Sequence, residues 1–396
     1  MFERSIKIKL ENLVKDYPVV TITGPRQSGK TTLVKDTYPN KSYYNLESPD
    51  LLELILSDPR EFFNNIDLKR GVILDEIQRA PELLSYIQVI VDENRIPGAF
   101  LLTGSHQVLL LEAVSQSLAG RCALLELLPL SINELKHAGF NLKTNEYLLN
   151  GLFPAIYKHN LDPIDTSRNY MKTYVERDVR QIINIKDLHS FQKFVKLCAG
   201  RVGSTVNLES LSSDVGVSQN TIKNWLSLME SSYILFQLQP YFENLGKRLM
   251  KAPKIYFLDV GLASYLLGIN STMQISHDRL KGALFENLVI TEILKYKYNR
   301  GEDSGIYFFR DSNHNEVDII MTSHDKLIPI EIKSTSTFHN SLLKGIKYFQ
   351  KSAKSRYSVG FLIYAGEMES KIDNIYIMNY KNLHKMMHII KESIDS

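Results

Sequence analysis

Two groups of residues in this sequence of 396 residues have types and spacing suited to chemistry, and the first is a glycine-rich loop. Residues 24–31, GPRQSGKT, fit the pattern G-x-x-x-x-G-K-[ST]. The backbone N–H groups of such a loop and the positive end of the following helix converge on one place, which suits the phosphates of a nucleotide. We expect Lys30 to reach the β- and γ-phosphates and the Thr31 hydroxyl to hold Mg²⁺. The pattern therefore predicts binding of ATP and Mg²⁺.

Two adjacent carboxylates lie about 45 residues further on, at the end of an apolar run. Residues 71–76 read GVILDE, which is the Walker B pattern. We expect Asp75 to bind Mg²⁺ through water and Glu76 to polarise the water that attacks the γ-phosphate. Glu76 and Lys30 are therefore the predicted catalytic groups, and Thr31 and Asp75 the predicted metal ligands. The residues predicted to bind the nucleotide are Gly24, Pro25, Arg26, Gln27, Ser28, Gly29, Lys30, Thr31, Thr32, Asp75 and Ser105.

Two hydroxyls and an arginine are candidates to complete this site. Thr103 and Ser105 follow a buried strand, where a hydroxyl can contact the γ-phosphate, although capping of the next helix explains them equally well. Arg121 could stabilise γ-phosphate charge within the chain or across a subunit interface, or it could form a surface salt bridge. A role across subunits requires a homo-oligomer, which the sequence leaves open. Arg177 and Arg180 are weaker candidates.

The second group lies in the last third of the chain and comprises Glu286, Asp318, Glu331 and Lys333. Residues i and i+2 of a strand face the same side, so Glu331 and Lys333 project together, as do Glu316 and Asp318. If the two strands pair as a hairpin, Asp318, Glu331 and Lys333 meet at one edge, with Glu286 arriving from a helix. This is the logic of the PD-(D/E)xK fold, in which carboxylates bind Mg²⁺ and the lysine orients the attacking water. Asp318 and Glu331 are the predicted metal ligands. Whether such a domain still cleaves DNA, or only binds DNA or protein, is left open by the sequence.

An α/β scaffold is needed to position the first group. Strand-like runs at 18–23, 41–46, 71–76, 99–105 and 122–128 alternate with helical segments. This alternation predicts a mostly parallel sheet with helices on both faces and a nucleotide at the carboxyl ends of its strands. We assign residues 1–135 to this P-loop ATPase core.

Residues 136–275 are predicted to form a helical linker and a winged helix. A helix over 208–215 stops at Gly216, and Ser218 caps a second helix over 219–229. Two strands then flank a basic wing at 246–251. Winged helices bind DNA but also dock proteins, and both readings stay open. The exposed side chains of the second helix are predicted to be Gln219, Asn220, Lys223 and Asn224.

Residues 276–396 are predicted to form a PD-(D/E)xK-like α/β domain. A helix begins at about residue 282, and strands follow at 306–310, 316–321 and 327–333. A further helix and two more strands complete such a core.

The composition narrows the class of protein. The content of 44% hydrophobic and 23% charged residues is ordinary for soluble proteins, and a net charge of +3 permits DNA binding without arguing for it. The two cysteines, Cys122 and Cys198, favour a reducing compartment over a disulfide framework. No apolar stretch approaches the length of a membrane span. We expect a soluble, cytoplasmic protein with no membrane partner.

Five stretches, taken in order, resemble a prokaryotic ATPase family: GPRQSGKTTL, GVILDEIQRAPELL, FLLTGSHQ, SLAGRCALLELLPLS and IYFLDVGLASYLLG. Members of that family have an AAA-like P-loop core, a winged helix, and a C-terminal domain of uncharacterised function related to restriction endonucleases. The resemblance covers nearly the whole chain. It implies ATP and Mg²⁺ binding by Gly29, Lys30, Thr31 and Asp75, with Glu76 as the catalytic carboxylate.

The sequence thus predicts an ATPase that couples nucleotide state to a DNA-facing winged helix and a nuclease-like domain. The alternative is a signalling switch, in which ATP changes the conformation and the C-terminal domain binds a protein. A third hypothesis is a Mg²⁺-dependent nuclease gated by ATP.

Overall fold

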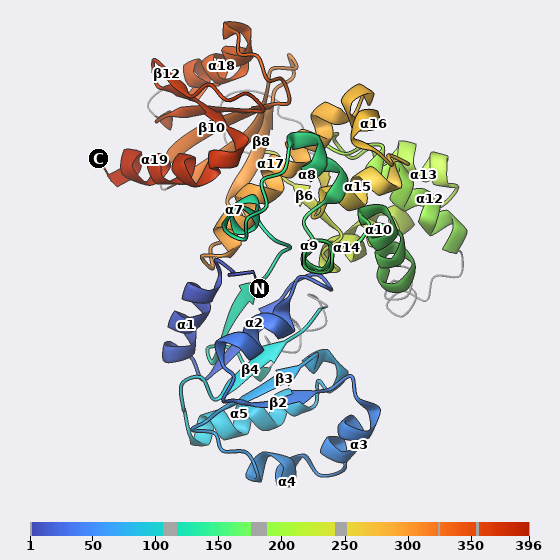
Figure 1. Ribbon diagram of the computed structural model, residues 1–396, viewed down its shortest axis with the longest axis vertical. Helices are drawn as coiled ribbons and strands as arrows, with labels where there is room; N and C mark the ends of the chain where they lie inside the picture. Colours follow the sequence, from blue (N-terminus) through green and yellow to red (C-terminus); the bar gives the residue numbers. More distant parts are fainter. Residues whose placement is uncertain are drawn as a thin grey trace.

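The computed structural model describes residues 2–105, 117–175, 188–241, 252–323, 325–353 and 356–395. Figure 1 shows an N-terminal lobe built on one sheet, a helical part beside it, and a second sheet at the far end. The α/β class and the parallel first sheet are as predicted, and a helical part and a second sheet domain follow them.

The first sheet is parallel throughout, with strand order β2-β3-β4-β1-β5. Its strands are β1 (Val19–Thr23), β2 (Ser42–Asn45), β3 (Val72–Asp75), β4 (Phe100–Thr103) and β5 (Cys122–Glu126). The apolar strands β1, β3 and β4 are fully buried because both faces of the sheet are covered, whereas the edge strands β2 and β5 are partly exposed. The carboxyl ends of β1, β3 and β4 consequently meet at one edge.

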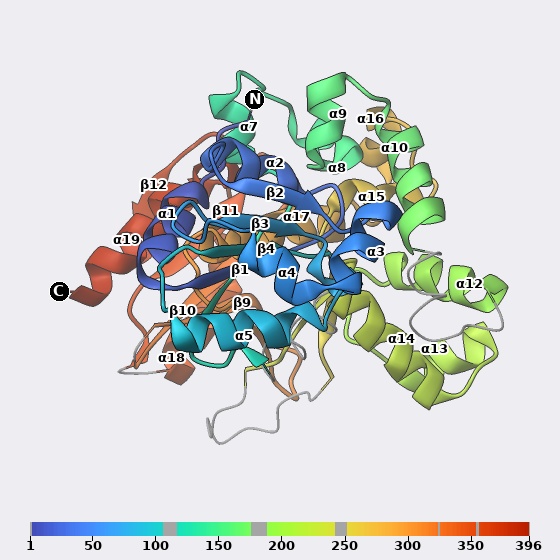
Figure 2. The same cartoon turned by 90° about the horizontal axis from the view of Figure 1, so that it is seen from below.

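Alternate residues of these strands enter two separate cores. Val72 and Leu74 point into the core under one face, and Ile73 points into the core under the other. Figure 2 shows the helices on both sides of the sheet. The first core is covered by α3 (Pro49–Ser57), α4 (Pro59–Asn64) and α5 (Leu83–Glu93), and the second by α1 (Lys7–Asp16) and α2 (Lys30–Thr37).

The middle of the chain is helical. Its helices include α7 (Ile132–His137), α8 (Thr144–Asn150), α9 (Pro154–His159), α10 (Pro163–Tyr170), α12 (Leu188–Ala199), α13 (Leu208–Val215), α14 (Gln219–Ser231), α15 (Val260–Leu266) and α16 (Thr272–His277). After α10 the helix continues as a π-helical turn over Met171–Val175. The strands β6 (Leu235–Leu238) and β7 (Lys254–Phe257) form an antiparallel pair after α14.

The second sheet is mixed, with strand order β12-β13-β11-β10-β9-β8. Its strands are β8 (Ile306–Arg310), β9 (Glu316–Ser323), β10 (Lys326–Lys333), β11 (Gly360–Tyr364), β12 (Ser370–Ile372) and β13 (Ile375–Asn379). The predicted hairpin exists, because β9 and β10 pair antiparallel, and β11 then pairs parallel to β10. The helices of this part are α17 (Lys281–Tyr298), α18 (Lys344–Ala353) and α19 (Leu383–Asp395).

One hydrophobic core joins the helical middle to the second sheet. It extends from Leu128 through Trp225 to Ile390, and α17 crosses it with Leu288 and Ile293 fully buried. The predicted boundary at 275/276 falls inside α16, and the parts on either side of it share this core. They are therefore expected to move as one body.

Candidate functional site

The glycine loop lies between β1 and α2, at the carboxyl edge of the first sheet. Gly24 has a φ of 143°, and a Cβ added there would lie 2.2 Å from the carbonyl oxygen of Leu127. Gly29 has a φ of 95° at the N-cap of α2. Both positions need glycine, because other residues rarely adopt these angles and the first has no room for a side chain.

Lys30 is the first residue of α2, and its side chain is buried within the loop. Its Nζ donates hydrogen bonds to the carbonyl oxygens of Gly24 and Pro25, both at 2.9 Å. Burial lowers the pKa of Lys30 to about 8, although the carboxylates of Glu76 and Asp75 act to raise it. A buried ammonium held by neutral carbonyl oxygens favours an anionic ligand.

The carboxylate of Asp75 is surrounded by hydroxyls. The Thr31 hydroxyl lies 2.9 Å and 3.1 Å from the two carboxylate oxygens, to which it donates. The Tyr43 hydroxyl donates to the same carboxylate at 2.7 Å. Thr103 also donates to it from β4. The structure therefore brings the two predicted Mg²⁺ ligands of this site, Thr31 and Asp75, into direct contact. Their oxygens are of the kind that Mg²⁺ prefers.

Glu76 follows β3 in a left-handed conformation, with a φ of 59°. Ser105 donates to its carboxylate at 3.0 Å, and the side chain of Gln78 donates to the same oxygen. Burial acts to raise the pKa of Glu76, but Lys30 and these hydrogen bonds bring it below the usual value. Glu76 is therefore ionised and oriented, as a group that polarises water must be. Unusual backbone angles of this kind gather at functional sites.

Ser105 thus contacts Glu76, and Thr103 contacts Asp75. The helix that they were also predicted to cap falls mostly at residues 106–116, outside the described residues, so the capping alternative stays open.

The loop also fits a phosphate ligand by a second criterion. The Ser28 hydroxyl is fully buried and, among the residues that the structure describes, has no hydrogen-bond partner. Buried polar groups are normally satisfied, so this orphaned hydroxyl fits a ligand oxygen. Of the other predicted nucleotide-binding residues, Gln27 and Thr32 are exposed on the loop and the first turn of α2, and Arg26 lies 3.8 Å from Glu47.

Arg121 does not reach this site within the chain. It precedes β5, and the register of β5 with β1 places it at the amino edge of the sheet, opposite the glycine loop. There it forms two hydrogen bonds to Asp92, at 2.5 Å and 2.8 Å. The prediction that Arg121 acts within its own chain is therefore wrong in this structure. A role in a neighbouring subunit stays a prediction, and Arg177 and Arg180 lie outside the described residues.

Arg4, which sequence reasoning missed, holds the back of the loop. Its guanidinium donates to the carbonyl oxygens of Ser28 at 2.6 Å and Leu128 at 2.7 Å. It also lies 3.3 Å from the buried carboxylate of Glu134. A lone arginine near the start of a chain carries no motif, so only the fold could reveal this contact.

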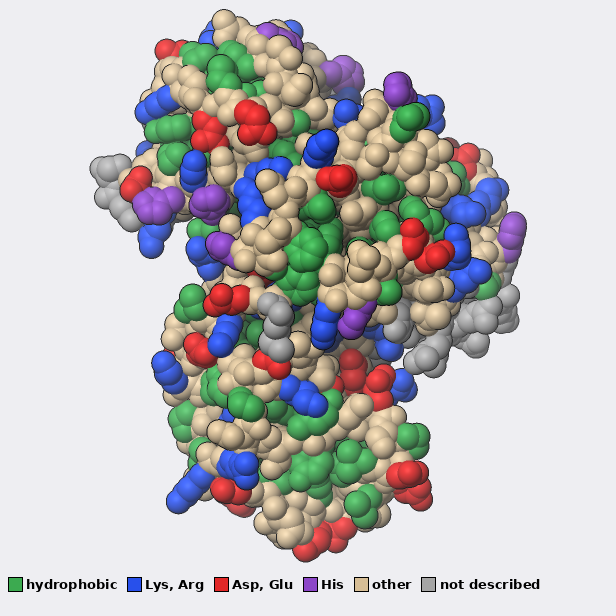
Figure 3. All heavy atoms as spheres, viewed as in Figure 1, with side chains coloured by type: hydrophobic (Ala, Val, Ile, Leu, Met, Phe, Trp, Pro, Cys, Tyr) green, Lys and Arg blue, Asp and Glu red, His purple; other side chains and the backbone are tan. Residues whose placement is uncertain are grey.

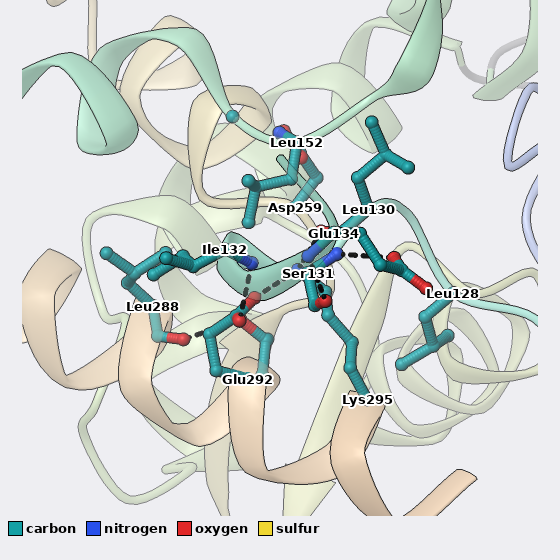
Figure 4. A network of polar contacts seen from close by, with 12 residues as sticks. Leu128, Leu130, Ser131, Ile132, Glu134, Leu152, Asp259, Leu288, Glu292 and Lys295 are labelled. Atoms are coloured by element: carbon teal, nitrogen blue, oxygen red, sulfur yellow. Dashed lines mark hydrogen bonds and ion pairs between the residues drawn. The ribbon is translucent and has the colours of Figure 1, made fainter. Parts of the chain in front are cut away.

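The polar contacts continue from Glu134 to α17, as Figure 4 shows. Glu134 accepts a hydrogen bond from the backbone N–H of Ser131 at 2.8 Å. The next N–H, of Ile132, donates at 2.8 Å to Glu292 on α17, which pairs with Lys295 at 2.8 Å. A buried polar network therefore links the glycine loop to the helix that carries Glu286.

The second predicted group also comes together. Lys333 lies 3.2 Å from Asp318 and 2.8 Å from Glu331, and the backbone N–H of Ile332 donates to Asp318 at 2.7 Å. Glu286 faces this group from α17, and Asp318 is close enough to raise its pKa.

Lys254 completes this cluster from β7, which the sequence assigned to the winged helix. Its Nζ lies 3.3 Å from Glu286 and 2.5 Å from Glu316. The Tyr256 hydroxyl donates to Glu286 from the same strand. No spacing rule connects a lysine at 254 to a glutamate at 286, so sequence reasoning missed Lys254 and Tyr256.

Carboxylates are crowded in this second cluster. Burial and the charge of Asp318 raise the pKa of Glu286 to about 7 and that of Glu331 to about 8. Burial acts to lower the pKa of Lys333, but Asp318 and Glu331 raise it above its usual value. The cluster therefore favours additional positive charge.

A metal ion at this cluster would have few protein ligands. In the part of the chain that the structure describes, no group of three or more His, Cys, Asp or Glu is arranged to hold a metal ion. One oxygen of Glu331 is nevertheless buried without a hydrogen-bond partner among the described residues. Mg²⁺ commonly uses one or two carboxylates with substrate phosphates, so Asp318 and Glu331 fit it in that form.

The predicted helix-turn-helix is present. Asn207 caps α13, Gly216 ends it with a φ of 88°, and Ser218 caps α14 by accepting from the N–H of Thr221 at 3.1 Å. The basic wing at 246–251 lies outside the described residues, so the name winged helix stays a prediction. The side chains of α14 that are exposed as predicted are Gln219, Asn220, Lys223 and Asn224.

These features define the first part of the chain as a P-loop ATPase domain. Residues 16–136 match the family model of an AAA domain, so this domain is AAA-like. Residues 141–273 and 281–383 match two domains of unknown function, DUF8612 and DUF4143. Neither description names a winged helix or a nuclease.

Relatives extend along most of the chain. An uncharacterised protein of Mycobacterium tuberculosis is 29% identical over 337 residues, which cover 84% of this chain and 74% of that protein. An uncharacterised protein of Haemophilus influenzae is 24% identical over 348 residues, covering 79% of this chain and 82% of that one. Among solved structures, a Walker-type ATPase of Pyrococcus abyssi is 14% identical with a TM-score of 0.45, over 67% of this chain and 96% of that chain.

Within the described ranges, every helix is too short or too polar to cross a membrane.

Proposed function

We propose that this chain is a cytoplasmic ATP-hydrolysing protein that couples its nucleotide state to a winged helix and a nuclease-like domain acting on DNA. Residues 1–135, 136–275 and 276–396 would be its three units. The proposal rests on the contacts at the carboxyl edge of the first sheet, where Lys30 at the start of α2 meets Asp75 and Glu76 at the end of β3.

Each residue of that edge has a distinct role in the proposal. Lys30 would place its ammonium beside the β- and γ-phosphates of ATP. Thr31 and Asp75 would hold Mg²⁺, which when bound neutralises phosphate charge. Glu76 would orient the attacking water and accept its proton, with Ser105 and Gln78 holding the carboxylate in place.

ATP turnover by the purified chain tests this proposal. Lys30→Ala removes the buried ammonium and is expected to abolish turnover. Lys69→Ala, at an exposed position after α4, is the matched control and should leave turnover unchanged. Equal turnover in the Lys30→Ala and unaltered proteins would refute the assignment of the site.

For the second site we propose a nuclease-like role, supported by the contacts of Lys333 with Asp318 and Glu331. Asp318 and Glu331 would hold Mg²⁺ near a scissile phosphate. Glu286 would face the same place from α17, and Lys333 would orient the attacking water.

Incubation with supercoiled, linear and single-stranded DNA tests this role, with Mg²⁺ and ATP each present or absent. Cleavage should require Mg²⁺ and disappear in both Asp318→Ala and Lys333→Ala. Cleavage that survives both changes would come from a contaminant or another site, and would overturn the assignment.

One observation favours the alternative, an ATP-dependent signalling switch that binds a protein partner and has no nuclease activity. The ammonium of Lys333 already pairs with both carboxylates, so Mg²⁺ binding between them would require the lysine to move. The two proposals differ in DNA affinity, which must fall as salt rises if phosphates are bound. ATP hydrolysis without any salt-dependent DNA affinity would support the switch.

A further inference from the structure

A cavity of about 560 Å³ lies between the ATPase domain and the C-terminal part. Its walls come from α1, α7, α17 and α19, and it contains none of the residues assigned to the two sites above. Figure 3 shows the molecule notched between its two lobes, with Lys, Arg and His side chains gathered along the notch. The basic residues that line this cleft include Lys7, Lys9, His137, Arg300, Lys381 and His384.

Positive charge in this cleft exceeds negative charge. The acidic residues among its lining are Glu3 and Glu292, and Glu292 is already paired with Lys295 at 2.8 Å. Lys381 donates to neutral oxygens, of Asn141 at 3.2 Å and of Leu142 at 2.7 Å. Neutral partners leave the charge of Lys381 uncompensated.

The positive charge of the cleft lowers the pKa values of nearby basic groups. Burial lowers the pKa of Lys136, and the nearby charge of Lys381 lowers it further. Burial likewise lowers the pKa of His384, and Lys136 and Lys385 add to the effect. Charges of one sign focused in a cleft attract a ligand of the other sign.

The lining suits a strand of nucleic acid. Arg300 lies over the ring of Tyr296, with 3.6 Å between its guanidinium carbon and the ring centroid, and amides of Asn12, Asn133 and Asn299 line the same cleft. Basic grooves combined with aromatic side chains are typical of single-strand binding. The volume is that of a small-molecule pocket, about 300–1,000 Å³, and therefore takes one or two nucleotides rather than a duplex.

We propose that this basic cleft binds the phosphodiester backbone of single-stranded nucleic acid. The inference rests on the proposed action on nucleic acid and names a place for it that neither the winged helix nor the carboxylate cluster includes.

The cleft also has a direct connection to the ATPase site. Ser131, Ile132 and Glu292 line it and belong to the buried network of Figure 4. Arg4 also lines the cleft and joins that network by its pair with Glu134, at 3.3 Å. Because Arg4 donates to the carbonyl oxygen of Ser28 in the glycine loop, a strand in the cleft and a nucleotide at the loop contact opposite ends of one network. Coupling between two sites is reciprocal, so each ligand should change the affinity for the other.

Fluorescence anisotropy with a short labelled single-stranded oligodeoxynucleotide tests the cleft. The double change Lys9→Gln/Arg300→Gln should weaken binding about tenfold and reduce the slope of log affinity against log salt by about 1.4, the value for two phosphate contacts. Arg60→Gln/Lys69→Gln removes the same charge from exposed positions at the far end of the ATPase domain and should change neither quantity.

The outcomes separate the inference from the proposed function. If the unaltered protein binds no nucleic acid, both the proposed action on nucleic acid and the proposed role of the cleft are refuted. If it binds a single strand and Lys9→Gln/Arg300→Gln binds equally well, the cleft alone is refuted. Competition by free AMP as strong as that by the oligonucleotide would identify a mononucleotide pocket and would also overturn the inference.

Arg4→Lys tests the connection separately. Lysine keeps the charge beside Glu134 but cannot bond the carbonyl oxygens of Ser28 and Leu128 as the guanidinium does. The quantity to compare is the ratio of the strand affinities measured with and without ATP, and this ratio should fall to one in the variant. An ATP effect of unchanged size would exclude Arg4 as the positioning residue.

Discussion

The two sites of this protein each contain a lysine close to carboxylates, but the pKa values of the two lysines are shifted in opposite directions. Lys30 donates to carbonyl oxygens, and burial lowers its pKa to about 8. Lys333 pairs directly with Asp318 and Glu331, whose charges outweigh burial and raise its pKa. The residue type is the same, and the partners decide the difference.

This contrast indicates what each site is built to receive. The glycine loop presents a cation and an orphaned Ser28 hydroxyl to an anion that the protein itself does not supply. The second cluster presents carboxyls with raised pKa values, which a proton or a metal ion would relieve. One site therefore favours a phosphate, and the other favours a cation.

The largest expected effect is at Glu76. Glu76→Gln keeps the size of the side chain but removes the carboxylate that polarises water, so ATP turnover should fall about 100- to 10,000-fold. Binding of ATP should persist, because Lys30 and the loop are intact, whereas Lys30→Ala should lose binding as well. Turnover assays and equilibrium binding to a fluorescent ATP analogue separate the two. Retained turnover in Glu76→Gln would mean that a group other than Glu76 polarises the attacking water.

The next effect is on folding, at Lys254. Lys254→Met leaves Glu286 and Glu316 without their buried cation, which should cost about 3–5 kcal/mol of unfolding free energy. Lys326→Met, at an exposed pair with Asp325, should cost at most about 1 kcal/mol. Urea unfolding followed by the fluorescence of Trp225, the single tryptophan, measures both, since Trp225 lies in the shared core. Equal losses of unfolding free energy in the two variants would mean that Lys254 does not compensate the charges of Glu286 and Glu316.

The preference of the second cluster for a cation should make the stabilisation by Mg²⁺ depend on pH. The folded state holds protons on Glu286 and Glu331 up to pKa values of about 7 and 8, above the usual 4.5, so this cluster loses stability as pH rises through that window. Mg²⁺ can take the place of those protons once they leave. Without nucleotide, Mg²⁺ should therefore raise the Tm more at about pH 9 than at about pH 6.

Asp318→Asn is the control for that measurement, because it removes a ligand and the charge that raises both pKa values. It should abolish the difference between the two pH values. A Mg²⁺ shift that is the same at both pH values in the unaltered protein would show that the cluster does not bind the ion.

The smallest effect is expected at Arg121. Arg121→Ala removes an exposed pair with Asp92 at the edge of the sheet opposite the loop, so turnover of the dilute protein should stay within about twofold. A large loss that develops only as protein concentration rises would point to an arginine acting across subunits. A large loss at every concentration would contradict the placement of Arg121.

Much of the first site could be predicted from local sequence. The glycine loop, its strand and its helix are contiguous, so Gly24, Gly29, Lys30 and Thr31 have their positions determined by neighbours in the chain. The parallel sheet followed from alternating strands and helices, and the Asp75–Glu76 pair from its place at a strand end. The hairpin that joins Asp318 to Lys333 was predictable for the same reason, because its two strands are adjacent in sequence.

Contacts between distant segments were not predictable in this way. Arg4 meets Ser28 and Leu128, Tyr43 meets Asp75, and Lys254 meets Glu286, yet none of these pairs has a characteristic spacing. For Arg121, the predicted role within the chain was wrong and the salt-bridge alternative matches its pair with Asp92, because the direction of an arginine before a strand depends on the register of the sheet. Parallel pairing put it at the amino edge.

By itself, then, the sequence determined the local chemistry: a phosphate-binding loop, a pair of strand-end carboxylates, and an acid-and-lysine hairpin. Each depends on backbone periodicity and on interactions over a few residues. Only the tertiary structure decided that β7 supplies a lysine to the C-terminal cluster, that one core joins the middle to the second sheet, and that a basic cleft opens between the lobes. Those outcomes depend on which surfaces pack together, and burial and charge balance among distant residues act only once the chain has folded.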